Sequence, residues 1–148
     1  MPAEGRVYIA TMQICDGESA ARVSRHRAQR ADMKFRTIEC PIDLAGADID
    51  DGNTVLLEDL PNLLANEMFD GGDPGRIVPA LRALAVTCRN LVIVTNDVFS
   101  DGVVYSDATL DYLQKLAAIN REAAKLADYV AEVVCSIPIP LKGETPCV

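Results

Sequence analysis

The chain contains a single histidine, His26, which lies in the densest cluster of basic residues in an otherwise acidic sequence. An imidazole nitrogen can act as a nucleophile, and nearby guanidinium groups can hold a polyanion such as a nucleoside triphosphate. The spacing of four between Arg22, His26 and Arg30 places these side chains on one face of a helix. The same pattern is also typical of a solvated basic face without a chemical role. The cluster comprises Arg22, Arg25, His26, Arg27, Arg30, Lys34 and Arg36.

A second candidate for chemistry is the segment TVLLED, residues 54–59, in which an apolar run ends in Glu58 and Asp59. Carboxylates at the end of a buried strand can hold Mg²⁺, directly or through water, or bind a ribose hydroxyl. The alternative is that they cap the helix that follows. The phosphate loop that usually accompanies such a strand, G-x-x-x-x-G-K-[ST], does not occur in the sequence. We therefore keep both interpretations of these carboxylates open.

The amino-acid composition indicates which class of molecule the chain binds. The 148 residues fit one domain, and the net charge of -8 argues against nucleic acid or an anionic membrane as the main partner. A local basic cluster on an acidic body fits a small anionic ligand better. Five cysteines without C-x-x-C spacing favour reduced thiols and a cytoplasmic location. No apolar run approaches the roughly 18–20 residues that a membrane-spanning helix requires.

The hydrophobic pattern predicts strands that alternate with helices. Because the strands are continuous apolar runs, we expect an α/β fold with a mostly parallel sheet and helices on both faces. Polar residues at the strand ends should converge on one rim, where such folds bind ligands; they are Thr11, Glu39, Glu58, Asp59, Asn96 and Asp97. The predicted strands are 6–10, 35–39, 54–57, 91–95 and 129–135. The first predicted helix could be capped by Asp16 or Ser19 and ends at about Gln29; the others are one from Pro61, 76–88 and 107–128. Residues 137–148 are expected to be a tail.

Short motifs occur in a fixed order from about residue 6 to residue 142. They are Tyr8-Ile9-Ala10-Thr11, Arg22-x-x-x-His26-Arg27-x-x-Arg30, Phe35-Arg36-Thr37-x-Glu39, Leu56-Leu57-Glu58 with Asn66, Val94-Thr95-Asn96-Asp97-Val98, Asn120 with Ala127-Asp128, and Pro140-Leu141-Lys142. In this order and spacing the chain resembles the bifunctional adenosylcobinamide kinase/adenosylcobinamide-phosphate guanylyltransferase family of cobalamin biosynthesis.

The resemblance implies a P-loop NTPase or RecA-like fold that handles GTP, or ATP for the kinase step. In that family a histidine takes GMP from GTP, releases pyrophosphate and passes GMP to the phosphorylated corrinoid. His26 aligns with that histidine, and the family also suggests a homo-oligomer, a trimer in particular. The positions that align with nucleotide-contacting residues are Ala10, Thr11, Met12, Arg27, Ala28, Gln29, Arg30, Glu39 and Glu58.

The chain also departs from the family pattern. The family opens with a strand and a GGxRSGKS phosphate loop, whereas here only five residues precede Arg6. We therefore expect little kinase activity unless a partner supplies the loop. We also expect the sheet either to close by pairing the former neighbours of the missing strand or to pair edge to edge between subunits. Two alternatives to an active guanylyltransferase are a non-catalytic paralogue that binds nucleotide or corrinoid, or regulates a partner, and a fragment of a longer gene product.

Overall fold

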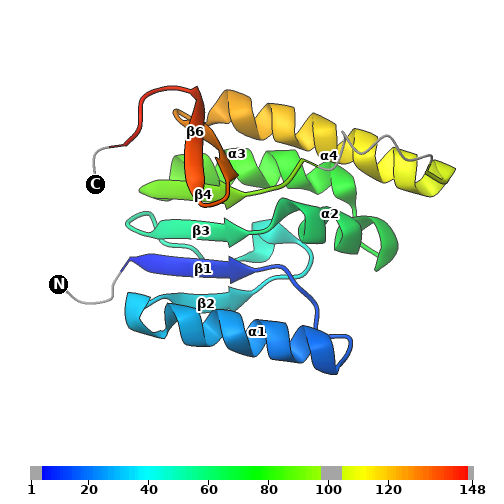
Figure 1. Ribbon diagram of the computed structural model, residues 1–148, viewed down its shortest axis with the longest axis horizontal. Helices are drawn as coiled ribbons and strands as arrows, with labels where there is room; N and C mark the ends of the chain where they lie inside the picture. Colours follow the sequence, from blue (N-terminus) through cyan, green and yellow to red (C-terminus); the bar gives the residue numbers. More distant parts are fainter. Residues whose placement is uncertain (1–4, 98–104, 147–148) are drawn as a thin grey trace.

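Four parallel strands form one sheet in the computed structural model, which describes residues 5–97 and 105–146 (Figure 1). They are β1 (Arg6–Ala10), β2 (Arg36–Glu39), β3 (Thr54–Glu58) and β4 (Asn90–Val94), in the order β2-β1-β3-β4. Every neighbouring pair is hydrogen-bonded, so the sheet is continuous within the chain. The predicted α/β fold with a mostly parallel sheet is confirmed. Direct pairing of the former neighbours of the missing strand stays a prediction. Pairing of sheet edges between subunits stays a prediction.

Four helices connect and cover these strands. The first, α1 (Gly17–Arg30), begins where Oδ1 of Asp16 accepts the backbone N–H of Ser19 at 2.7 Å, which satisfies one of the unpaired donors of the first turn. The others are α2 (Leu60–Phe69), α3 (Ile77–Thr87) and α4 (Asp107–Leu126). Short 3-10 turns at Ala31–Met33, Leu44–Gly46 and Pro74–Arg76 complete the connections. Within the described residues, none of the helices is long and apolar enough to cross a membrane.

One face of the sheet is covered by three helices. Side chains alternate along a strand, so Val7 and Ile9 of β1 point to the same face as Val55 and Leu57 of β3, and each is at most 1% exposed. They form one cluster with the apolar faces of three helices, including Leu60, Leu63 and Leu64 of α2, Ile77 and Leu81 of α3, and Leu116 of α4. We call this the covered face.

The other face, which we call the open face, is covered only in part. Strand register places Tyr8, Leu56 and Val92 side by side on it. The helix α1 lies over β1 and β2 (Figure 1) and contributes no fully buried residue. Val92 and Val94 of β4 remain 51% and 38% exposed. A parallel sheet is normally covered on both faces, so this region departs from the usual pattern.

The last strand predicted from the sequence, at 129–135, does not join the parallel sheet. β5 (Val130–Val134) instead forms an antiparallel hairpin with β6 (Ile137–Lys142). The prediction of a tail over 137–148 was therefore wrong for its first six residues. Pro138 and Pro140 had suggested an irregular segment, but a proline is tolerated on an edge strand because its missing N–H then faces outward.

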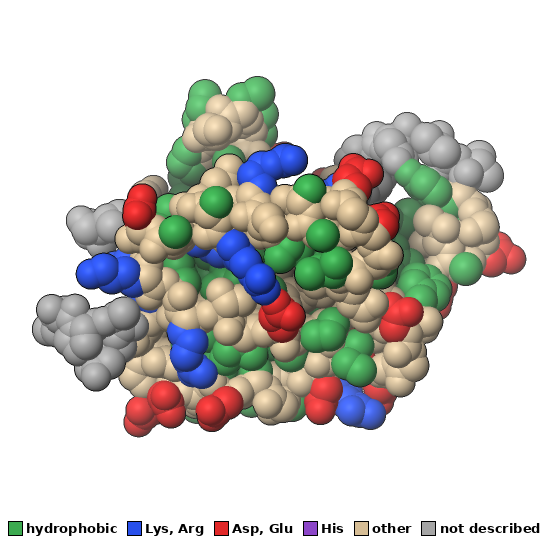
Figure 2. All heavy atoms as spheres, turned by 90° about the horizontal axis from the view of Figure 1, so that it is seen from below, with side chains coloured by type: hydrophobic (Ala, Val, Ile, Leu, Met, Phe, Trp, Pro, Cys, Tyr) green, Lys and Arg blue, Asp and Glu red, His purple; other side chains and the backbone are tan. Residues whose placement is uncertain are grey.

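The hairpin is attached to α4 at its base. Nζ of Lys142 donates hydrogen bonds to the carbonyl oxygens of Ala124, at 2.9 Å, and Ala127, at 2.6 Å, which satisfies acceptors at the C-terminal end of α4. Beyond this attachment the hairpin stands away from the body, and a mostly apolar projection is visible at its place in Figure 2. Its exposed apolar residues are Val133, Val134, Ile137, Ile139 and Leu141.

Candidate functional site

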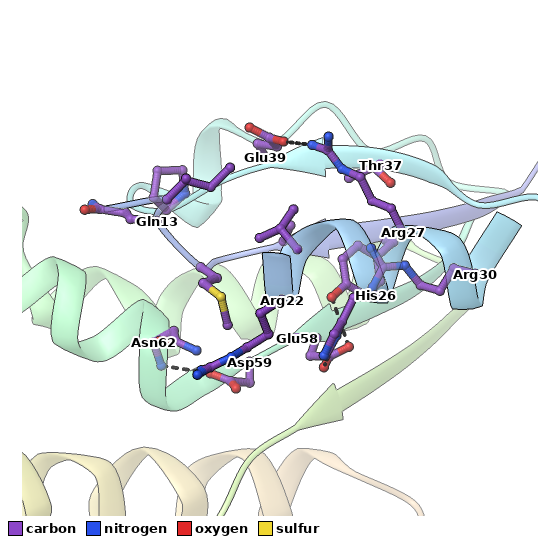
Figure 3. A pocket seen from close by; sticks show the side chains of 16 residues that line it. Gln13, Arg22, His26, Arg27, Arg30, Thr37, Glu39, Glu58, Asp59 and Asn62 are labelled. Atoms are coloured by element: carbon purple, nitrogen blue, oxygen red, sulfur yellow. Dashed lines mark hydrogen bonds and ion pairs between the residues drawn. The ribbon is translucent and has the colours of Figure 1, made fainter. Parts of the chain in front are cut away.

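A cavity of about 380 Å³ lies between α1 and the carboxyl ends of β1, β2 and β3. This is the size range in which small-molecule sites are usually found. Figure 3 shows that α1 contributes His26 and its neighbouring arginines to the cavity, and that Glu58 at the end of β3 lies beside His26. The cavity therefore lies at the rim where ligands of parallel α/β sheets bind.

His26 and Glu58 lie next to each other in the lining of this cavity (Figure 3). Nδ1 of His26 lies 3.5 Å from Oε1 of Glu58, and their side chains are 37% and 28% exposed. The second oxygen of the carboxylate, Oε2, accepts a hydrogen bond from the hydroxyl of Tyr8 at 3.0 Å. Burial, with a contribution from the Glu58 carboxylate, raises the pKa of Tyr8 to about 12. The three side chains thus form one connected polar group.

Two arginines of α1 are also held by specific partners. The guanidinium carbon of Arg30 lies 3.3 Å from the centroid of the Tyr8 ring, which is a cation–π contact. Arg27 pairs with Glu39 at the end of β2. Arg22 lines the same cavity. Three positive side chains therefore lie within one site, in an arrangement that suits a phosphorylated ligand.

Hydrogen bonds from two buried side chains to the backbone hold the strand ends behind the site. Thr11 is completely buried, and its hydroxyl accepts the N–H of Asp59 at 2.8 Å. The buried side-chain amide of Asn66 donates to the carbonyl oxygens of Thr11, at 2.8 Å, and Pro41, at 2.9 Å. These contacts join the loops that follow β1 and β2 to helix α2. The position of the cavity rim is therefore coupled to the core.

The structure brings most of the predicted site residues together. Thr11 lies behind the wall, and Ala28 and Gln29 do not line the cavity. Asn96 and Asp97 also lie elsewhere, and the amide of Asn120 donates to the carbonyl of Asn96 at 3.3 Å. Whether any of these residues contacts a nucleotide stays a prediction. Those that line the cavity are Ala10, Met12, His26, Arg27, Arg30, Glu39, Glu58 and Asp59.

Sequence reasoning missed several residues of the lining, of which Tyr8 and Thr37 are the most informative. Both could have been found from the two-residue period of a strand. Tyr8 lies two positions before Ala10, and Thr37 two positions before Glu39, so each pair shares a face. The register confirms that Tyr8 lies beside Thr37 and Ala10 beside Glu39.

The magnesium site expected at Glu58 and Asp59 stays a prediction. The part of the chain that the structure describes contains no group of three or more His, Cys, Asp or Glu residues that could hold a metal ion. Glu58 is engaged by Tyr8 and His26. Asp59 accepts the N–H of Asn62 at 2.8 Å as the cap of α2, and burial raises the pKa of this carboxyl. The capping alternative thus fits Asp59, and no step below depends on a metal held by these residues.

Comparison with known proteins agrees with the geometry. The model of the family described as cobinamide kinase / cobinamide phosphate guanyltransferase matches residues 2–141. The chain belongs to this family. It is 32% identical to the bifunctional adenosylcobalamin biosynthesis protein CobU of Escherichia coli over 156 residues, which covers 92% of this chain and 85% of the relative.

Two further relatives have similar names. The bifunctional adenosylcobalamin biosynthesis protein CobU of Salmonella typhimurium is 31% identical, with 92% of this chain and 85% of the relative covered. The protein CobP of Pseudomonas aeruginosa, with the same description, is 29% identical, with 93% and 82% covered. The family therefore combines two nucleotide-dependent activities on cobinamide, and the site of this member can be compared with the needs of each.

The surface of this family member is mixed in charge outside the site. Figure 2 shows the side on which α1 lies, where Lys and Arg side chains are interspersed with Asp and Glu side chains rather than forming one continuous basic area. This face therefore offers no extended basic surface to which a large polyanionic ligand could bind. The cluster of arginines around the cavity is thus a local feature, as a small anionic ligand requires.

Proposed function

We propose that this chain is a guanylyltransferase that transfers GMP from GTP to adenosylcobinamide phosphate through a covalent intermediate on His26. The observation that carries the proposal is the position of the imidazole in the cavity wall, between arginines of its own helix and a carboxylate of β3. A nucleotidyl transfer of this kind requires a nitrogen nucleophile and positive charge around the phosphates. The site supplies both.

In the proposed reaction an imidazole nitrogen of His26 attacks the α-phosphorus of GTP. A nitrogen–phosphorus bond forms, the bond between the α-phosphorus and the oxygen that bridges to the β-phosphate breaks, and pyrophosphate leaves. An oxygen of the phosphate on adenosylcobinamide phosphate then attacks the same phosphorus. The nitrogen–phosphorus bond breaks and the imidazole is regenerated.

The arginines have distinct parts in this reaction. Arg27 lies next to His26 in sequence, and its side chain is 53% exposed beside Glu39, so it can reorient toward a phosphate that enters. Arg30 is held on the ring of Tyr8 and presents a positive charge at a fixed place. A fixed positive charge that faces the reacting phosphate stabilises charge that develops in the transition state.

The kinase half of the family's chemistry has less support in this chain. The sequence contains no G-x-x-x-x-G-K-[ST] loop, whose backbone amides and lysine normally hold the triphosphate for phosphoryl transfer. We therefore propose that this chain performs guanylyl transfer with the kinase step lost. A magnesium ion would enter with GTP, bound to its phosphates.

A second candidate is a non-catalytic module that binds nucleotide or corrinoid. The ion pair between Arg27 and Glu39 favours it, because this pair neutralises a charge that a bound triphosphate would otherwise use. The two candidates differ in whether a covalent bond forms, so one experiment separates them.

The test is incubation of the full chain with GTP labelled on the α-phosphorus. We expect protein-bound label that is labile to acid and stable to alkali, as a phosphoramidate is, and that is absent from the variant His26→Gln. Label from GTP carrying the isotope only on the γ-phosphorus should not be retained, because pyrophosphate leaves. Arg25→Ala, a change of an exposed arginine outside the cavity, serves as the matched control. Binding of GTP without any covalent label would instead support the non-catalytic module.

A further inference from the structure

The two ring nitrogens of His26 have different surroundings. Nδ1 lies 3.5 Å from Oε1 of Glu58. An ionised carboxylate can only accept hydrogen bonds, so it favours the tautomer in which the nitrogen that faces it carries the proton. We propose that Glu58 and Tyr8 hold His26 in the Nδ1–H tautomer, so that Nε2 is the atom that takes the nucleotidyl group. This inference rests on the function proposed above and names the reacting nitrogen and a positioning residue, Tyr8.

Glu58 can hold the imidazole in place because it is itself held. Its other oxygen, Oε2, accepts the hydroxyl of Tyr8 at 3.0 Å, so each oxygen of the carboxylate has a different partner. Tyr8 is only 4% exposed and its ring has neighbours on two sides. The ring of Phe35 packs against it edge-on, with the centroids 6.4 Å apart, and the guanidinium group of Arg30 lies over its face. A side chain enclosed in this way has little rotational freedom.

Strand register explains how Tyr8 reaches Glu58. The residue directly opposite Glu58 on β1 is Ala10, and Tyr8 lies two positions earlier on the same face. Diagonal neighbours of this kind are within reach of an aromatic side chain. The contact is therefore built into the sheet rather than into a loop.

The tautomer has a direct chemical consequence. When Nε2 attacks phosphorus, the ring acquires a positive charge, while the proton stays on Nδ1 and no base has to remove it. The carboxylate of Glu58 then lies against an imidazolium ion and stabilises it, as a buried carboxylate does beside a catalytic histidine in serine proteases. When the acceptor phosphate takes the nucleotidyl group, the nitrogen–phosphorus bond breaks and the Nδ1–H imidazole returns. Glu58 and Tyr8 orient the ring throughout.

The sole histidine of the chain makes this inference directly measurable. With ¹⁵N-histidine incorporated, two-bond ¹H–¹⁵N correlation spectra of the full chain report the tautomer of His26 alone, before any nucleotide is added. We expect a protonated Nδ1 and an unprotonated Nε2. Glu58→Ala should remove this preference. Tyr112→Phe is the matched control, because it deletes a half-buried tyrosine hydroxyl that donates to the carbonyl of Pro61 and does not line the cavity.

Kinetics then test the positioning role of Tyr8. The variant Tyr8→Phe keeps the ring and loses only the hydroxyl, so the rate constant for labelling at saturating GTP should fall about 10-fold, as expected for a lost hydrogen bond to a charged group. The dissociation constant for GTP should hardly change, because Tyr8 acts through Glu58. Glu58→Gln keeps an acceptor for Nδ1–H without its charge and should lower the rate constant about 100-fold. Tyr112→Phe should alter neither quantity.

Several results would overturn the inference. They are an Nε2–H tautomer in the unmodified chain, GMP found on Nδ1 by ³¹P and ¹⁵N spectra of the labelled protein, or a Tyr8→Phe rate equal to that of Tyr112→Phe. A failure of the proposed function looks different, since it leaves no label on the protein. In that case Nε2 is not a nucleophile, while the tautomer of the free chain still shows whether Glu58 positions the ring.

Discussion

The two faces of the sheet differ in what they contribute. On the covered face, the side chains of β1 and β3 are closed over by α2, α3 and α4 and are at most 1% exposed. On the open face, Tyr8, Ala10 and Glu58, which come from alternate positions of the same two strands, line the cavity beside α1. One strand therefore supplies a core residue and a site residue in turn. The residues proposed for function are therefore immediate sequence neighbours of residues that stabilise the core.

The largest effect should come from the covered face. Leu57→Ala removes a completely buried side chain and should lower the free energy of unfolding by about 2–5 kcal/mol, through lost burial and the cavity left behind. Val92→Ala on the open face is the counterpart, and because that side chain is 51% exposed we expect a loss below about 1 kcal/mol. Denaturation with urea measures both values.

If Val92→Ala lowers the free energy of unfolding as much as Leu57→Ala does, the proposed difference between the two faces is wrong. That result would show that the open face is buried in solution. A cost that grows with protein concentration would identify a second copy as the cover, because subunit association makes apparent stability depend on concentration.

Much of the fold could be predicted from sequence because each strand and helix carries its own local signal. The apolar run of β3, the capping residue Asp16 and the helical spacing of the basic cluster are all local features, and the structure has the corresponding elements. The hairpin could not be predicted in this way. Pro138 and Pro140 argue against a central strand, and only the pairing with β5 shows that they lie on an edge strand.

The site was predictable in part for a related reason. His26 and Glu58 could be singled out by residue type and spacing alone. The role of Tyr8 depends on which residue lies opposite Ala10, which is a property of strand register and not of any local pattern. The buried hydroxyl of Thr11 could likewise be assigned to the backbone only once the ends of β1 and β3 were adjacent. Residue types and their spacing thus indicated the chemistry, and the order and register of the strands identified the residues that support it.

An intermediate effect should come from the residue that links the two regions. Asn66→Ala leaves two carbonyl oxygens without their donor, at Thr11 and Pro41, and should lower the free energy of unfolding by about 1–3 kcal/mol. Because these carbonyls hold the rim of the cavity, affinity for GTP should fall as well. Asn90→Ala, which removes an exposed side-chain amide that bonds Thr54 outside the cavity, is the control. A loss of stability with unchanged GTP affinity would show that the rim does not depend on this link.

The smallest effect should come from the exposed part of the basic cluster, and its signature is its dependence on salt. The side chain of Arg27 is 53% exposed, so its attraction for a triphosphate is screened by dissolved ions. We expect Arg27→Ala to weaken GTP binding several-fold at low ionic strength and hardly at all in about 1 M salt, where the Debye length is only about 3 Å. Arg25→Ala removes the same charge outside the cavity, so isothermal titration of both variants separates local contact from net charge. Equal losses for both would mean that the cluster acts only through its total charge, and the distinction between the two faces would then not extend to the binding of the nucleotide.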